Sequence, residues 1–296
     1  MYISIIIPVY NASKFLADLF EALERNEFEE GDEVLLVDNG SSDNSLELCK
    51  NQAEKYGNLY KVLQYTEKAG SYATRNYAVK QAKGELLVFT DSDTRPVPNW
   101  IKTIRSSICE GMVIAGKIQL EIVNNGLWEH FDTIAHLQSE MSEKNSSVAT
   151  ANMAVLRTDF DKIGYFEERF SGGDYEWSGR AVSKGMKINF IPAAMVYHPT
   201  RKTFGQILKK EQRIAYGAGN HQKNCNKALT TLVIKYVLKV FKIDTNIRYS
   251  KQLRSVGMAF RDIAYFNLKF MKIRMEQLKF AIRGYKMIDA RSFGIK

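Results

Sequence analysis

The sequence contains little cysteine and little proline. Its 296 residues include only three cysteines and five prolines. Cys49, Cys109 and Cys225 are far apart, odd in number and without metal-ligand spacing. This excludes a disulfide framework and a cysteine-based zinc site. It predicts three buried, unpaired thiols that behave as small apolar residues in a reducing compartment.

Long apolar runs and glycine-rich phosphate loops are also missing. No uninterrupted apolar stretch is long enough to span a bilayer. The sequence enters a β-branched run at once, without the basic and apolar regions of a signal peptide. No G-x-G-x-x-G or G-x-x-x-x-G-K-[ST] pattern follows an expected strand, which excludes a dinucleotide-binding Rossmann site and a P-loop. We therefore expect a cytoplasmic protein.

Charge is distributed unevenly along the chain. The net charge is +9, from 42 Lys and Arg against 33 Asp and Glu. Residues 1–200 carry a net charge of −8, whereas residues 201–296 contain 22 basic and five acidic residues and carry +17. The basic character therefore belongs to the last third of the chain, and so does any anionic partner that it implies.

The first ninety residues alternate between apolar β-branched runs and amphipathic segments. Strands are expected at 2–9, 33–37, 60–65 and 86–90, with helices between them near 13–23, 44–56 and 72–82. This βαβαβαβ order predicts an α/β fold with a doubly wound, mostly parallel sheet flanked by helices.

The expected strand at 86–90 ends in two carboxylates. Leu86–Phe89 is apolar without polar alternation, which indicates a buried parallel strand, and Asp91 and Asp93 follow it directly. Ligands of an open parallel sheet bind at the carboxyl ends of its strands. Two acids at i and i+2 on a short turn can place oxygens around one hard divalent cation, together with a diphosphate and water. The sequence therefore predicts a cation site at this edge.

Five motifs, in this order, resemble those of family 2 glycosyltransferases. They are Ser-Ile-Ile-Ile-Pro-Val-Tyr-Asn (4–11), Val-Asp-Asn-Gly-Ser-Ser-Asp (37–43), Ala-Thr-Arg-Asn (73–76), Thr-Asp-Ser-Asp (90–93) and Gly-Gly-Asp-Tyr-Glu-Trp (172–177). The resemblance covers residues 2–202 and implies a GT-A fold that uses nucleotide-diphosphate sugars. It also implies a nucleotide-sugar half at 1–98 and an acceptor half at 99–202.

The resemblance implies a role for each motif in binding the donor. Tyr10 would stack on the nucleobase and Asp38 would accept a hydrogen bond from its edge, with Asn39 where the family has a second acid. Arg75 would supply paired donors to ribose or phosphate. The full expected nucleotide-sugar site comprises Pro8, Tyr10, Asn11, Asp38, Arg75, Asn76, Asp91, Ser92, Arg201 and Lys202.

The expected cofactor is Mn²⁺ or Mg²⁺, which offsets the charge that builds on the departing diphosphate. Asp93 is expected to be its direct ligand, and Asp91 to bind ribose or metal-bound water. The resemblance implies that His198 completes the metal shell. A lone histidine is also a common structural residue, so a purely structural role for His198 is the alternative.

Inverting sugar transfer needs a base opposite the leaving group. A carboxylate at the start of a helix has its charge favoured by the helix dipole. Asp174 matches the second acid of the family's Glu-Asp pair and is the expected base; Gly173 replaces the usual Glu, and Glu176 is the alternative. Asn152 and Met153 match the family's acceptor-side segment, and Trp177 is placed on the same side.

Residues 203–296 are expected to form basic amphipathic helices with aromatic residues. Such helices suit an anionic membrane surface. The alternative is a helical cap with a solvated basic face. With the membrane reading, the protein would be peripheral on the inner face of the cell membrane.

The sequence therefore predicts an inverting, metal-dependent glycosyltransferase that uses a UDP-sugar and acts on a hydroxyl of a cell-surface glycan or lipid-linked precursor. Three alternatives remain: a retaining transferase of the same fold, a sugar nucleotidyltransferase, and a binding protein whose basic tail holds an anionic partner. The absence of a glycine-rich N-terminal loop argues against the second, and the absence of a nucleic-acid module argues against nucleic acid as that partner.

Overall fold

The computed structural model describes residues 1–287 of the chain, so the predicted tail is described except for residues 288–296. The chain forms two compact units. Unit 1 comprises residues 1–121, 137–168 and 173–199, and unit 2 comprises 122–136, 169–172 and 200–296. Two segments that the sequence places in the acceptor half, 122–136 and 169–172, thus belong to the same unit as the basic tail.

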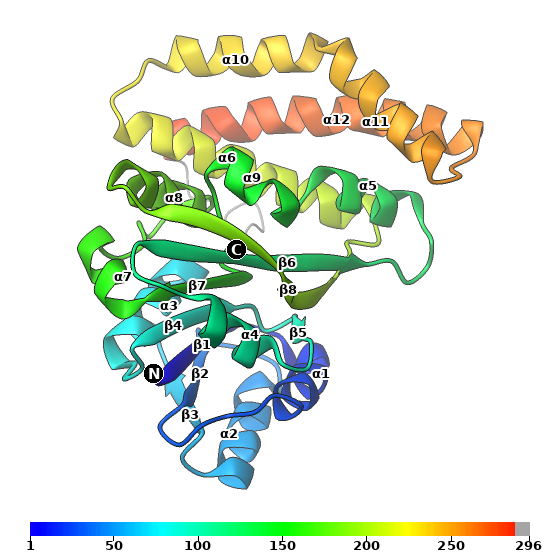
Figure 1. Cartoon of the computed structure of the whole chain (residues 1–296). Coiled ribbons are helices and arrows are strands. Elements are labelled where there is room, and N and C mark those ends of the chain that lie inside the picture. Colours follow the sequence, from blue (N-terminus) through cyan, green and yellow to red (C-terminus); the bar gives the residue numbers. More distant parts are fainter. Residues whose placement is uncertain (288–296) are drawn as a thin grey trace. The chain divides into compact units, whose positions relative to one another are not determined.

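Unit 1 is built on one eight-stranded mixed sheet (Figure 1). Its strands are β1 (Ile3–Val9), β2 (Glu33–Asp38), β3 (Tyr60–Gln64), β4 (Leu86–Thr90), β5 (Arg95–Pro96), β6 (Met112–Glu121), β7 (Asn152–Leu156) and β8 (Lys187–Pro199), in the spatial order β3-β2-β1-β4-β7-β6-β8-β5. The strands β3, β2, β1 and β4 are mutually parallel, as the alternation predicts. β7 runs antiparallel to both β4 and β6, so the sheet is mixed.

Helices cover both faces of this sheet. They are α1 (Ser13–Glu24), α2 (Ser45–Tyr56), α3 (Ser71–Gln81), α4 (Trp100–Ser107), α6 (Ser142–Asn145), α7 (Arg157–Ile163) and α8 (Gly173–Ser183), with a 3-10 turn at Ser139–Met141. Alternate residues of the central strands enter two separate apolar clusters: Ile5 and Ile7 pack with α1, whereas Ile6 and Phe89 pack with α3, α7 and α8. Apolar residues on both faces explain the continuous apolar runs in these strands.

Unit 2 is helical. It contains α5 (Leu127–Ala135), α9 (Phe204–Asn224), α10 (Leu229–Phe241), α11 (Ile243–Ser255) and α12 (Phe260–Tyr285). The long helix α12 packs against α9, α10 and α11 (Figure 1). Aromatic rings from α5 and α12, including Trp128, Phe131, Phe266 and Phe270, form its main apolar cluster. Among residues 1–287, no helix combines the length and apolar character needed to cross a bilayer.

The prediction for the cysteines is only partly correct. All three thiols are free, and Cys49 is buried between α2 and the sheet. Cys109 and Cys225, however, are exposed. They lie after the ends of α4 and α9, where the chain turns at the surface.

Candidate active site

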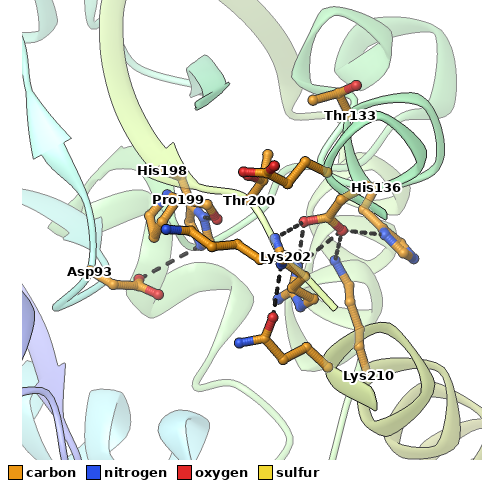
Figure 2. Close-up of polar contacts among 12 residues, drawn as sticks. Asp93, Thr133, His136, His198, Pro199, Thr200, Lys202 and Lys210 are labelled. Atoms are coloured by element: carbon orange, nitrogen blue, oxygen red, sulfur yellow. Dashed lines mark hydrogen bonds and ion pairs between the residues drawn. The ribbon is translucent and has the colours of Figure 1, made fainter. Parts of the chain in front are cut away.

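Two acids and a histidine come together at one end of the unit 1 sheet. Asp91 and Asp93 follow β4, and His198 lies near the end of β8. One ligand atom from each of the three lies within 4.8 Å of the others. The Asp93 Oδ1 and His198 Nε2 atoms are 3.6 Å apart, as the dashed line in Figure 2 marks. More than a hundred residues of sequence separate the histidine from the acids, so only the sheet brings them together.

A hydrogen bond orients His198 towards the acids. Its Nδ1 lies 2.8 Å from the carbonyl oxygen of Pro199, which can only accept, so Nδ1 carries the hydrogen. This leaves the Nε2 lone pair on the side of Asp93, the arrangement typical of histidine ligands to metals. His198 is only 6% exposed. The donor set of two carboxylates and one imidazole thus fits a divalent cation.

Two threonine hydroxyls hold the turn that carries the acids. Thr94 Oγ1 donates to the carbonyl oxygen of Asp91 over 2.8 Å, and it lies 2.7 Å from Thr90 Oγ1. Thr90 Oγ1 in turn donates to the carbonyl of Ala151 on the neighbouring segment over 2.9 Å. Both threonines are fully buried. The carboxylates are therefore presented on a turn whose backbone is fixed from beneath.

Arg75 joins this turn to helix α3. Its guanidinium Nη2 forms an ion pair with Asp91 Oδ1. Arg75 is 2% exposed, and within residues 1–287 its Nε has no hydrogen-bond partner. A buried donor without an acceptor costs free energy. A hydrogen-bond acceptor on a ligand would satisfy it, and the expected contact with ribose or phosphate stays a prediction.

Asp174 lies at the start of α8 and accepts a hydrogen bond from Tyr72, a residue that no sequence motif indicates. Tyr72 Oη donates to Asp174 Oδ1 over 2.8 Å, and the backbone amide of Tyr175 donates to the same oxygen over 2.9 Å. Burial and the neighbouring carboxylate raise the pKa of Tyr72 above its usual value, so the phenol keeps its proton and acts as a donor. The other oxygen, Oδ2, has a long contact of 3.5 Å to the amide of Thr150.

One face of helix α3 contacts both Asp174 and the turn that carries Asp91. Tyr72 and Arg75 are separated by three residues on this helix and therefore share a face. Tyr72 contacts Asp174 while Arg75 contacts Asp91. The sequence does hold a signal for Tyr72. It lies three positions before Arg75, a predicted site residue, and residues at this spacing share a helix face.

The other candidate base, Glu176, is engaged in a bidentate ion pair. Its two oxygens lie 2.6 Å from Arg180 Nε and 3.1 Å from Arg180 Nη2. Gly173 also has a steric reason to lack a side chain, since a Cβ there would meet the ring of Tyr72 at 2.9 Å and the carbonyl of Glu167 at 3.0 Å. The Tyr72 ring therefore occupies the space that the family's Glu would need.

The expected base pocket is at the same sheet edge. β1 and β2 pair in parallel with Val9 opposite Asp38, so the segment 8–11, containing Pro8, Tyr10 and Asn11, lies beside Asp38. The backbone amides of Gly40 and Ser41 donate to Asp38 Oδ2 over 3.0 and 3.2 Å. Asn11 has φ 47°, a left-handed conformation that asparagine tolerates, and its Oδ1 accepts from the amide of Ser42 over 2.7 Å.

Several predicted site residues are buried and contact other residues of the protein. The Asn76 amide donates to the carbonyl of Phe166 and accepts from its N–H. Asn152 is 1% exposed and bonds Trp100, Lys117 and Ala194. Met153 and Trp177 are fully buried in the core. Ser92 is half-buried in the acid turn. The assignments of Asn152, Met153 and Trp177 to the acceptor, and of Asn76 to the nucleotide, stay predictions.

Arg201 and Lys202 belong to unit 2. Both the backbone amide and the guanidinium of Arg201 contact the buried carboxylate of Asp132, at 2.9 and 3.2 Å. The Lys202 amide donates to Gln206 Oε1 at the start of α9. Their expected contact with the donor phosphates stays a prediction.

The buried carboxylate of Asp132 is the centre of a charged cluster in unit 2. Figure 2 labels two members of this cluster, His136 and Lys210. His136 bridges Asp132 to Glu211, with 2.6 Å from each ring nitrogen to a carboxylate oxygen. Burial alone would raise the pKa of Asp132, but the hydrogen bond from His136 and the charge of Arg201 hold it well below its usual value. Burial, with the charge of Arg201, lowers the pKa of Lys210 to about 7.

Comparisons with known proteins identify the family of the chain. The family described as glycosyl transferase family 2 matches residues 4–165, and glycosyl transferase family group 2 matches residues 86–281. Glycosyltransferase AglE of Haloferax volcanii is 33% identical over 222 residues, 73% of this chain and 72% of AglE. The poly(ribitol-phosphate) β-N-acetylglucosaminyltransferase TarS of Staphylococcus aureus is 39% identical over 213 residues, 68% of this chain but only 36% of TarS.

Solved structures support the fold. The mannosyltransferase PcManGT from Pyrobaculum calidifontis, in complex with GDP-Man and Mn²⁺, has a TM-score of 0.65 at 14% identity and covers 97% of this chain and 88% of its own. Residues 1–349 of TarS, in complex with UDP-GlcNAc, have a TM-score of 0.55 at 19% identity, with 99% and 92% covered. The predicted GT-A fold is confirmed. This chain belongs to glycosyl transferase family 2 and is a glycosyltransferase.

Proposed function

We propose that this enzyme is an inverting, metal-dependent transferase that moves a sugar from a nucleoside diphosphate, UDP in the first instance, to a hydroxyl of a cell-surface glycan or lipid-linked precursor. The observation that supports it best is the cluster of Asp91, Asp93 and His198, beside Arg75, at the carboxyl end of β4. Relatives and neighbours named for UDP-GlcNAc, GDP-Man and poly(ribitol phosphate) fit this substrate class.

The cluster would hold the cation through Asp93 and His198, with Asp91 as a further ligand or as a contact to ribose or bound water. Because an imidazole is among the ligands, Mn²⁺ suits the site better than Mg²⁺ does. When bound, the cation would offset the negative charge of the leaving diphosphate. Arg75 would add its unused Nε donor on the same side.

Asp174 would act as the base. It would accept the proton of the acceptor hydroxyl as that oxygen bonds to C1, while the bond from C1 to the diphosphate breaks and its electron pair leaves with the diphosphate. Tyr72 would hold one carboxylate oxygen in place and leave the other for the proton. Glu176 is the weaker candidate because Arg180 occupies both of its oxygens.

The place of action is part of the proposal. An acceptor on a lipid carrier would be reached by a peripheral protein on the cytoplasmic face of the cell membrane. The basic region 203–296 would supply the attraction to anionic lipid, in keeping with its high density of Lys and Arg.

Calorimetric titration tests the donor site. UDP, GDP, CDP and dTDP are titrated into wild-type protein with Mn²⁺ and with chelator, and then into Asp93→Ala and into Asp161→Ala, which removes an exposed acid on α7. We expect metal-dependent binding of one nucleotide that is lost in Asp93→Ala and kept in Asp161→Ala. If no nucleotide binds wild-type protein, the donor site is wrong.

The product tests the stereochemistry and the base. With the sugar nucleotide so identified, the anomeric configuration of the product by NMR separates inversion from retention. Asp174→Asn should abolish transfer while leaving nucleotide binding intact, and Glu176→Gln should retain most activity. An active Asp174→Asn enzyme would remove Asp174 from the base role.

A further inference from the structure

The three last helices of unit 2 expose an unusual number of large apolar side chains. Nine of them are between 48% and 74% exposed: Ile234, Leu238 and Phe241 on α10, Ile243 and Ile247 on α11, and Phe260, Leu268, Met271 and Met275 on α12. Isolated exposed apolar residues are normal, but a concentration of this kind on consecutive helices marks an interaction surface. We call these nine residues the apolar stripes.

The stripes have the period of the helices that carry them. At about 100° per residue, Phe260, Leu268, Met271 and Met275 fall within about 80° on the wheel of α12 and run about 22 Å along it. Ile234, Leu238 and Phe241 fall within about 60° on α10. Each stripe is therefore a continuous face and not a scatter of residues.

Helix α12 has a second apolar face that accounts for its folding. Phe266, Phe270, Ile273 and Phe280 are buried against the other helices of unit 2. A surface helix needs one such face to pack on its core. The four residues of the outward stripe on α12 are 51–74% exposed, so the stripe lies largely outside this packing and requires another explanation.

Basic residues lie beside the stripes. The range 229–285, which spans helices α10 to α12, contains 12 Lys and Arg and three Asp and Glu. Arg261, Lys272 and Lys279 lie about 100–120° from Phe260 on the wheel of α12, next to its stripe. The guanidinium of Arg254 lies 5.8 Å from the ring of Phe260.

We infer that the apolar stripes insert into the interfacial region of an anionic lipid bilayer, with the flanking Lys and Arg at its headgroups. Amphipathic helices with a basic polar flank bind in this way, lying in the plane of the membrane. A second copy of this chain fits less well, because pairing the stripes of two copies would bring like charges together. The inference rests on the membrane partner of the proposed function and not on its sugar-transfer chemistry.

Vesicle sedimentation tests the inference. Full-length protein is mixed with vesicles of phosphatidylcholine alone and of equimolar phosphatidylcholine and phosphatidylglycerol. We expect binding to the anionic vesicles, weakened by high salt, which shortens the Debye length to about 3 Å at 1 M. Phe241→Ser/Leu268→Ser should weaken binding by at least about 100-fold, because burying each such side chain is worth at least about tenfold.

Matched variants separate the stripes from general effects. Val123→Ser also removes an exposed apolar side chain of unit 2, and it should bind vesicles as wild type does. Lys235 follows Ile234 of the stripe on α10 and is exposed, as is Lys272 on α12. Lys235→Glu/Lys272→Glu should weaken binding to anionic vesicles by at least about 20-fold, since each charge near the surface contributes about 1 kcal/mol. Lys102→Glu, on α4 of unit 1, should not. All altered side chains are exposed, so circular dichroism should be unchanged.

Three results would overturn the inference. They are the absence of binding to anionic vesicles, equal binding by Phe241→Ser/Leu268→Ser, and a wild-type dimer in solution that this double variant dissociates. Nucleotide titration of the same variants keeps the two proposals apart. A variant that binds nucleotide but not vesicles has lost only the membrane contact, whereas wild-type protein that binds vesicles but no nucleotide contradicts only the donor site.

Discussion

Replacing Gly219 by alanine should destabilise unit 2, although alanine is the better helix former. Gly219 lies in the interior of α9, where the higher helix propensity of alanine alone would raise the free energy of unfolding by as much as about 1 kcal/mol. A Cβ at Gly219 would lie 1.9 Å from the carbonyl oxygen of Ala281 on α12. An ordinary carbon–oxygen contact is about 3.3 Å, so the two helices would have to separate by about 1.4 Å.

The atom in the way, the carbonyl oxygen of Ala281, belongs to the backbone and cannot rotate away as a side chain would. The loss of stability from overpacking should therefore reach the upper end of its usual range, about 3 kcal/mol. The expected net loss in free energy of unfolding is therefore about 2 kcal/mol. Urea unfolding followed by circular dichroism measures it as a lower midpoint at unchanged slope.

Gly179→Ala is the matched control. Gly179 is also inside a helix, α8, but a Cβ there would meet no atom within 4 Å. This variant should be as stable as wild type or up to about 1 kcal/mol more stable. If Gly219→Ala were stabilised to the same extent as Gly179→Ala, the close approach of α9 and α12 would be refuted.

Three further predictions concern the site and its surroundings. Gly173→Glu, which restores the family's acid pair, should lower both stability and transfer activity, because its Cβ would collide with the ring of Tyr72; a gain in activity would contradict this. Thr94→Val should cost about 1–3 kcal/mol of stability and weaken metal-dependent nucleotide binding in calorimetry, since it removes the hydroxyl that holds the carbonyl of Asp91. Burial lowers the pKa of Lys210 from 10.5 to about 7, so the unfolded chain binds more protons between these values. The free energy of unfolding should therefore rise across about pH 7 to 10.5, and Lys210→Met should flatten this rise in urea titrations at several pH values.

The sequence predicted the strands and helices of the first ninety residues well. The strands β1 to β4 and the helices between them follow from apolar runs and helical periodicity, because each is a local pattern of burial. The antiparallel β7 could not be predicted, since its pairing with β4 and β6 is a long-range contact that a short apolar segment does not encode. The grouping of 122–136 and 169–172 with the tail could not be predicted either, because it also depends on contacts between distant parts of the chain.

The candidate site divides in a similar way. Asp91 and Asp93 could be found from the sequence because they follow a buried strand, and Asp174 because it lies in a motif that resembles one of the family's. The contact of Tyr72 with Asp174 and the burial of Asn152, Met153 and Trp177 could not, because they depend on which side chains face one another across elements far apart in the chain.

What the sequence alone determined, then, is local: the order of strands and helices, the acids at their ends, the family motifs and the excess of positive charge after residue 200. What only the tertiary structure decided is which groups meet. In the folded chain, His198 lies next to Asp93 and the Tyr72 ring fills the space beside Gly173. One apolar face of α12 lies outside the core. The physical reason is that hydrophobic periodicity specifies that a face is buried, whereas close packing of the whole chain specifies against what.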